Sequence, residues 1–225
     1  MLASNINGLK YPDEALTRFF FKSGLNDIKE SVLELGCNSG NNLRLFYEYG
    51  WDVTGVDLCK TSLSAAEENL LALQQEYQLK NRISLVHDDM LHFFESTSME
   101  SVHTVLFPSS LFYLAYADIV RTLEILSKKI RPGGYLFLKV LTDSDYRFTN
   151  VNKEKISEFS YRINFIETGE YSQIITFLSR EQWQSLLEKY FVFESLDILD
   201  LDYESVQNGI TIRNSNIICY GRLVS

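Results

Sequence analysis

The sequence predicts an α/β fold in which a mostly parallel sheet is covered by helices on both faces. Between positions 31 and 141, short apolar runs alternate with segments of helical periodicity. That alternation is typical of strands joined by crossover helices. A tight turn bearing Gly36 and Gly40 follows the first apolar run, and the last two apolar runs are joined without a helix between them.

The elements can be placed in order along the chain. A first helix is expected to begin near Pro12, because proline suits the first turn, and to end at Gly24, which suits a helix C-terminus. Parallel strands are predicted at 31–36, 52–57, 83–87, 102–107 and 135–141. Helices are predicted at 41–49, 61–78 and 117–130, the last ended by Pro132, Gly133 and Gly134.

The C-terminal part of the chain has a different pattern. Ser179 and Gln182 are spaced as a capping box, which predicts a helix through Lys189. The strands that follow, at 191–201 and 215–223, are connected directly and are therefore expected to be antiparallel. Five parallel strands and this pair predict a sheet of seven strands.

Residues 142–178 do not belong to this plain alternation. Residues 158–166 and 171–177 alternate polar and apolar side chains on either side of a possible turn at 167–170, which predicts a β-hairpin. The insertion leaves the sheet at the carboxyl end of its fifth strand, where open α/β sheets bind ligands. It could cap a substrate, or it could be a peripheral hairpin that only lengthens the sheet.

Composition bounds the function. With 225 residues, 45% of them hydrophobic and 23% charged, the chain is expected to form one domain, of which 1–30 is a helical extension. The net charge of −9 disfavours nucleic acid as a partner. We expect no membrane span, no secretion signal and no metal site, and the three cysteines suggest reduced, buried thiols in a cytoplasmic protein. The oligomeric state is not predicted.

The glycine-bearing turn predicts a binding site for a nucleoside-bearing ligand. Gly36 and Gly40 allow the backbone to approach a ligand closely, while Glu34 precedes the turn and Asp57 ends the next strand. A dinucleotide fingerprint would carry a third glycine, whereas Asn38 stands at the middle of this turn. Asparagine tolerates left-handed backbone, so the turn is compatible with it.

This arrangement resembles the first motif of the class I S-adenosylmethionine-dependent methyltransferases. The resemblance implies a Rossmann-like fold, with Glu34 serving the amino-acid end of the cofactor and Asp57 the ribose. Asp89 would accept from the adenine amine, with Asp88 as a competing candidate whose ordinary role would be a helix N-cap. The cofactor-binding residues that the resemblance implies are Glu34, Gly36, Cys37, Asn38, Gly40, Asn41, Asp57, Leu58, Asp89, Met90 and Phe107.

The same resemblance implies methyl transfer to a heteroatom of a small-molecule or carbohydrate-type acceptor. Candidates for a catalytic base are Asp143, Asp145 and His103, in that order, although a histidine at a strand start is more often structural. Tyr11 and Arg18 could contact the methionine end of the cofactor. Departures from the family pattern at Asn38 and His103 leave open a cofactor-binding regulatory protein, and an NAD-dependent oxidoreductase is a further alternative.

Overall fold

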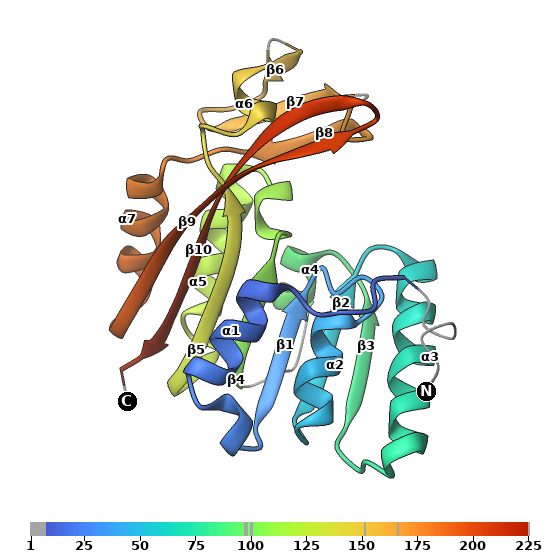
Figure 1. The fold of residues 1–225 in the computed structure, drawn as a ribbon. Coiled ribbons are helices and arrows are strands. Elements are labelled where there is room, and N and C mark those ends of the chain that lie inside the picture. The colour runs from blue at the N-terminus through green and yellow to red at the C-terminus, as the bar shows by residue number, and fades with distance from the viewer. Residues whose placement is uncertain (1–7, 97–98, 100, 151, 166, 225) are drawn as a thin grey trace.

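The computed structural model describes residues 8–96, 99, 101–150, 152–165 and 167–224, so positions 1–7 of the expected N-terminal extension and position 166 of the expected hairpin lie outside it. Its main feature is a seven-stranded sheet with the order β3-β2-β1-β4-β5-β10-β9 (Figure 1). The first five strands in this order are parallel, and β10 is antiparallel to both β5 and β9. The predicted Rossmann-like architecture is therefore confirmed.

Most predicted elements lie within one or two residues of their observed bounds. The strands are β1 (Ser31–Leu35), β2 (Asp52–Asp57), β3 (Ile83–His87), β4 (Val102–Pro108), β5 (Ile130–Leu141), β9 (Phe193–Gln207) and β10 (Ile210–Leu223). The helices are α1 (Glu14–Lys22), α2 (Asn41–Glu48), α3 (Lys60–Tyr77), α4 (Met90–Ser96), α5 (Tyr116–Leu126), α6 (Tyr146–Thr149) and α7 (Arg180–Tyr190).

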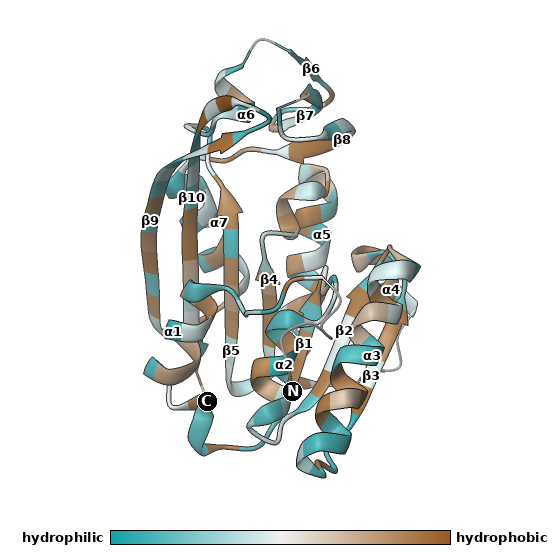
Figure 2. Cartoon of the chain, turned by 45° about the vertical axis from the view of Figure 1, so that its right-hand side comes forward, coloured by the Kyte–Doolittle hydropathy of each residue, from teal (hydrophilic) through white to brown (hydrophobic). Residues whose placement is uncertain are grey.

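Helices cover both faces of the sheet, as predicted. One hydrophobic core joins the strands to α1, α2 and α3, and a second joins them to α4, α5 and α7. Figure 2 shows the hydrophobic residues concentrated on the central strands and on the inward sides of the helices. On α3, the face predicted to be apolar is buried through Leu63, Ala66, Leu70 and Leu73.

Helix α1 is fixed at both ends by local signals. The Asp13 side chain accepts from the backbone N–H groups of Ala15 and Leu16, and Gly24 adopts a left-handed conformation just beyond the helix. The buried ring of Phe19 packs against aromatic rings of β5 and β10, which holds α1 on the sheet. The capping box of α7 is also present, with Ser179 and Gln182 bonded reciprocally.

The insertion after β5 contains the predicted hairpin and one additional strand. Strands β7 (Ser160–Phe165) and β8 (Glu170–Thr176) pair antiparallel, and β6 (Lys153–Lys155) adds to β7 to give a three-stranded sheet. We call this sheet together with α6 the cap. Ile163, Phe165 and Ile175 are fully buried in the same hydrophobic core as α5 and α7, so the cap is packed into the body of the protein.

Three sequence expectations differ from the structure. Helix α5 ends at Leu126 rather than near Ile130, because β5 already begins at Ile130 and bulges through Pro132 before it pairs regularly with β4. Strands β9 and β10 are longer than predicted and meet at Asn208 and Gly209, where the chain turns toward the cap (Figure 1). Short helix α4 was not predicted.

Candidate functional site

The turn between β1 and α2 has the backbone geometry that its glycines predict. Gly36, Asn38 and Gly40 have positive φ angles of 79°, 47° and 76°. The N–H groups of Gly36 and Cys37 both donate to the carbonyl of Val56 on β2, at 2.8 and 3.1 Å. The turn is therefore anchored to the neighbouring strand, and it begins α2 at the carboxyl edge of the sheet.

Position 36 has no room for a side chain. A Cβ atom placed on Gly36 would lie 2.6 Å from the Cβ of Ser110, in the segment that follows β4. Ser110 Oγ also donates a hydrogen bond to the carbonyl of Leu35. The turn after β1 and the segment after β4 are thus in direct contact, and this contact limits the distance between them.

Asp57 at the end of β2 is tied to the glycine turn. Its Oδ2 accepts from the N–H of Asn38, and its Oδ1 accepts from the N–H of Cys59, both at 2.8 Å. The carboxylate is only partly buried, and the neighbouring Leu58 is 65% exposed. The structure therefore brings the predicted ribose-binding residue, an exposed apolar side chain and the turn to one edge of the sheet.

Glu34 is buried beside the same turn, with one carboxylate oxygen left without a partner. Its Oε1 accepts from Asn42 Nδ2 at 2.7 Å, whereas the buried Oε2 has no hydrogen-bond partner among the described residues. Burial, with the nearby charge of Asp57 adding to it, raises the pKa of Glu34 to about 8 against the opposing effect of the Asn42 bond. An orphaned acceptor at this position fits a cationic ligand group such as the amino group of S-adenosylmethionine.

The segment before α1 lies over the glycine turn. Leu9 N donates to Ser39 Oγ, Asn41 Nδ2 donates to the carbonyl of Tyr11, and Asp13 N donates to Asn42 Oδ1. Asn41, predicted to bind the cofactor, thus uses its side chain to hold this segment. Arg18 pairs instead with Glu14 in an exposed ion pair at 2.6 Å, so the structure does not direct it to the turn.

Asp88 and Asp89 follow β3, and the helix-capping role considered for Asp88 belongs to Asp89. Asp89, not Asp88, caps α4, because its Oδ1 accepts from the N–H groups of Leu91 and His92. Asp88 accepts from the N–H of Asp89 and pairs with the imidazole of His92, which raises the pKa of that histidine. Asp89 remains beside Asp57 at the carboxyl edge, since Asp88 N donates to the carbonyl of Asp57.

Three of the predicted cofactor residues present little or no side chain to a ligand. Phe107 is fully buried in the core beneath the edge, so its ring does not form a wall of an open site. Cys37 packs among Gly55 and Leu43, and burial raises the pKa of its thiol. Met90 is half-buried against the core. Cys59, in contrast to the expectation for all three cysteines, is exposed.

Two of the three candidate bases are poorly placed. His103 lies at the amino end of β4, the edge opposite the glycine turn, where it packs on Trp51 and Tyr135 and burial lowers its pKa. Asp145 is fully buried, and its oxygens accept from Arg147 and from the N–H of Ser215. Asp143, which follows β5 and is half-buried, is the candidate that stays at the correct edge.

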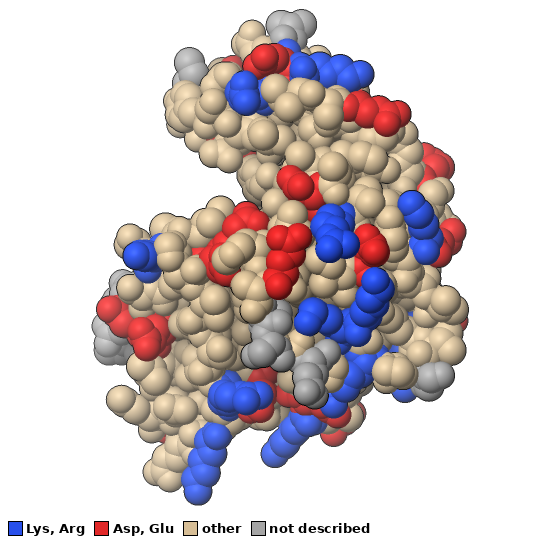
Figure 3. Space-filling model, turned by 180° about the vertical axis from the view of Figure 1, so that it is seen from behind, with Lys and Arg blue, Asp and Glu red and all other residues tan. Residues whose placement is uncertain are grey.

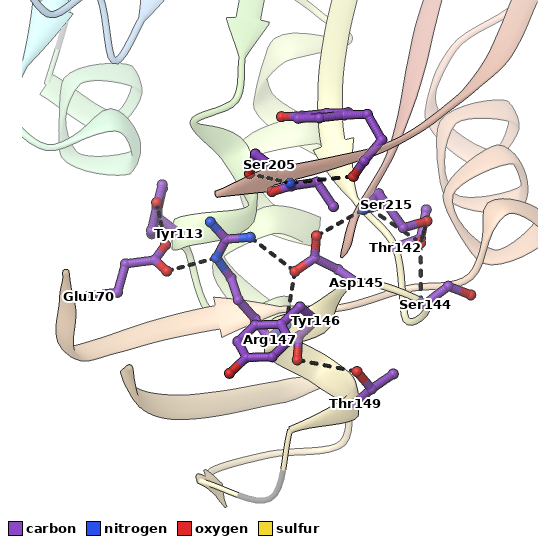
Figure 4. A network of polar contacts seen from close by, with 12 residues as sticks. Tyr113, Thr142, Ser144, Asp145, Tyr146, Arg147, Thr149, Glu170, Ser205 and Ser215 are labelled. Carbon is purple, nitrogen blue, oxygen red and sulfur yellow. Dashed lines mark hydrogen bonds and ion pairs between the residues drawn. The ribbon is translucent and has the colours of Figure 1, made fainter. Parts of the chain in front are cut away.

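A polar network at this edge joins the residues after β5 to Tyr113 and Glu170, two contacts that the sequence did not predict (Figure 4). Arg147 donates from Nη1 to Asp145 at 3.0 Å and from Nε to Glu170 at 2.7 Å, while the Tyr113 hydroxyl donates to the other Glu170 oxygen at 2.8 Å. Tyr113 ends the short helix η3 (Leu111–Tyr113), and Glu170 begins β8 of the cap. Ser109, which follows β4 shortly before Tyr113, has a positive φ of 72°. This backbone conformation is unusual for a residue with a side chain and is common at functional sites.

Figure 3 shows a deep cleft on one side of the molecule, between the part that carries the cap and the rest of the sheet. A separate groove of about 480 Å³ lies between α1 and β9, and its lining contains none of the glycine-turn residues. Among the described residues, no group of histidine, cysteine and acidic side chains could hold a metal ion. The described helices include none long and apolar enough to cross a membrane.

Comparison with known proteins gives one family. Residues 6–190 match the model of a family described as a methyltransferase domain. No curated protein matches the chain.

Solved structures of similar fold come from several organisms. A SAM-dependent methyltransferase of Methanosarcina mazei is 19% identical, with 88% of this chain and 94% of that one covered at a TM-score of 0.62. The 1,6-didemethyltoxoflavin-N1-methyltransferase of Burkholderia thailandensis, solved with S-adenosylhomocysteine, is 15% identical, with 94% and 77% covered at 0.60. N-methyltransferase NodS of Bradyrhizobium japonicum is 14% identical, with 95% and 99% covered at 0.59.

Asp57→Asn is expected to weaken binding of S-adenosylmethionine by roughly tenfold or more, because charge-assisted hydrogen bonds contribute about 1.5–3 kcal/mol each. Isothermal titration calorimetry measures this directly. Asp52→Asn is the matched control, since Asp52 lies at the other end of β2. Equal loss of affinity in both variants would contradict the assignment of Asp57.

Glu34→Gln is expected to stabilise the free protein at about pH 8 while weakening cofactor binding. The pKa of Glu34 is raised from 4.5 to about 8 in the folded protein. Between these pH values the folded protein keeps the Glu34 proton and the unfolded chain loses it. The free energy of unfolding therefore falls by on the order of 1.4 kcal/mol per pH unit as the pH rises from about 4.5 toward 8. Urea unfolding near both pH values measures the difference, and a stability gain that does not grow with pH would contradict this account.

Proposed function

Since this chain belongs to the methyltransferase family and its cofactor is S-adenosylmethionine, we propose that it methylates a heteroatom of a small polar molecule held beneath the cap. The observation that supports this most strongly is the combination at one edge of the sheet of the glycine turn, Asp57 and the unpartnered oxygen of Glu34. This edge is also where the cap is joined to the sheet, through β5 and α6.

The residues at this edge have complementary roles in holding the cofactor. Asp57 would bind the ribose hydroxyls while the N–H groups of Asn38 and Cys59 keep its carboxylate oriented. Glu34 would receive the amino group at Oε2, and Asn42 fixes the other oxygen. Asp89 would accept from the adenine amine, and the exposed Leu58 would pack against the base.

The bound cofactor supplies an activated methyl group, so the rate of transfer depends mainly on how the protein positions the acceptor. The protein must hold the acceptor heteroatom in line with that methyl and must exclude water from the contact. The cap is the part of the chain placed to do both, because its strands pack into the core that also carries the segment after β4. We therefore assign residues 142–178 the role of an acceptor cap.

A small acceptor suits the electrostatics of the chain. The net charge of −9 opposes the approach of a nucleic acid, whose binding depends on neutralised phosphates. The structurally similar enzyme of Burkholderia thailandensis, by its name an N1-methyltransferase of 1,6-didemethyltoxoflavin, acts on a small molecule. A carbohydrate-type metabolite remains within the proposal. The free cysteines Cys37, Cys59 and Cys219 suit a reducing compartment, and we propose a cytoplasmic location.

A regulatory protein that binds the cofactor without catalysis is the second candidate. Two observations favour it. Asp145 is already engaged in structural hydrogen bonds, and His103 lies at the opposite edge of the sheet, so neither is placed to act as a catalytic base. An NAD-dependent oxidoreductase fits poorly, because Glu34 would lie close to the ligand's phosphates and the third glycine is missing.

The proposal predicts binding of S-adenosylmethionine at micromolar level and transfer of its labelled methyl group into small molecules. Calorimetry measures the affinity, with NAD as the comparison ligand that should bind far more weakly. A tritiated methyl donor incubated with the small-molecule fraction of cells that make the protein detects transfer. Binding without any transfer would support the regulatory alternative, and tight NAD binding without heat from the methyl donor would exclude both.

A further inference from the structure

We propose that Tyr113 and Glu170 form a proton relay beside the acceptor, and that the acceptor is therefore methylated on a hydroxyl oxygen. This inference rests on the proposed methyltransferase function and deepens it by naming the acceptor group. In the relay, the Tyr113 hydroxyl contacts the acceptor and Glu170 receives the proton.

Tyr113 is placed by a short chain of contacts that begins at the glycine turn. Gly36 touches Ser110, and Ser110 Oγ bonds to the Leu35 carbonyl at the end of β1. The chain then passes through η3 to Tyr113, whose N–H donates to the carbonyl of Ser110 at 3.1 Å. Tyr113 therefore follows directly from the segment that touches the cofactor turn. The residue as a whole is 39% exposed.

Glu170 is held with its carboxylate aimed at Tyr113. Its Oε1 accepts from the Tyr113 hydroxyl at 2.8 Å, and its Oε2 accepts from Arg147 Nε at 2.7 Å. Arg147 is itself fixed by the fully buried Asp145. Figure 4 shows this series of contacts running from Ser215 and Asp145 through Arg147 to Glu170 and Tyr113. Arg147 and Asp145 are thus positioning residues, and Glu170 and Tyr113 stand at the end of the network.

The electrostatics suit a relay better than a lone tyrosine base. Burial of the hydroxyl, together with the Glu170 charge and hydrogen bond, raises the pKa of Tyr113, so the phenol keeps its proton at neutral pH. A protonated phenol can still accept a proton on oxygen while it gives its own proton to a carboxylate. Glu170, already the acceptor of that hydrogen bond, is the group that can take it.

The step is balanced as follows. The acceptor oxygen forms a bond to the methyl carbon, the bond between that carbon and sulfur breaks, and its electron pair stays on sulfur. The acceptor hydroxyl proton moves to the Tyr113 oxygen as the Tyr113 proton moves to Glu170 Oε1. Water later removes the proton from Glu170. A neutral amine acceptor needs no such base during the transfer, whereas a hydroxyl acceptor gains from one. The Glu170 carboxylate, reached through the Tyr113 hydroxyl, supplies the base that methylation of a hydroxyl oxygen needs.

Two variants test the relay: Tyr113→Phe, which removes the hydroxyl, and Glu170→Gln, which keeps a hydrogen-bond acceptor but cannot take the proton. The purified small-molecule fraction of the producing cells and the tritiated methyl donor are the probes, and mass spectrometry identifies the methylated atom. We expect an O-methyl product and a fall in turnover of about 100-fold or more in each variant. Calorimetric affinity for S-adenosylhomocysteine should stay within about twofold, because the cofactor site is formed by other residues.

Tyr77→Phe, at the exposed end of α3, is the matched control and should leave both quantities unchanged. An N-methyl product, or an O-methyl product formed at undiminished rate by both variants, would overturn the relay while the methyltransferase function stands. Loss of cofactor affinity in parallel with turnover would show that Tyr113 and Glu170 only hold the cap in place, and it would overturn the relay too. No transfer by the unaltered protein would instead refute the proposed function itself.

Discussion

The geometry of the carboxyl edge depends on the absence of a side chain at position 36. Gly36 lies so close to Ser110 that even one methyl group would force the turn after β1 and the segment after β4 apart. Because the turn is also bonded to Val56, any such displacement would reach β2 and its terminal Asp57. It would equally reach η3 and, through Tyr113, the cap. One close contact therefore couples the groups that would hold the cofactor to the groups that would hold the acceptor.

Local sequence signals predicted the elements that depend on local interactions. Strands β2 and β3 were placed at their observed bounds, and the Ser179 capping box marked the start of α7. The extended ends of β9 and β10 were missed because residues such as Asp202 and Arg213 are polar. They lie in strands because each pairs across the ladder, Asp202 with Ser215 and Arg213 with Glu204. Pairing partners are set by the fold rather than by nearby sequence.

Motif spacing placed Glu34 and Asp57 near the ends of their strands, and the structure has them there, at the edge that carries the glycine turn. His103, the last of the three candidate bases, packs on Trp51 and Tyr135 at the opposite edge, which agrees with the structural role expected for a histidine at a strand start. Phe107 was expected to face a ligand, yet it is fully buried, because helices cover both faces of β4 and its side chains pack into a core on either side. The contact of Tyr113 with Glu170 spans 57 positions in sequence and exists only after the cap has packed on the sheet. No local pattern could have indicated it.

Strand β9 lies at the edge of the sheet, where a second copy of the protein could pair with it. Its outer edge is 15 residues long and is not paired within the described sheet, and such an edge can template pairing with another chain. Asp197 and Glu204 are exposed along it, as are Asp200 and Asp202, which pair with Arg180 and Arg213. Two copies approaching edge to edge would bring like charges together, which opposes pairing. The long strand can therefore support the cap without drawing the protein into open-ended fibrillar assemblies, and this protection should weaken as acidification neutralises the carboxylates.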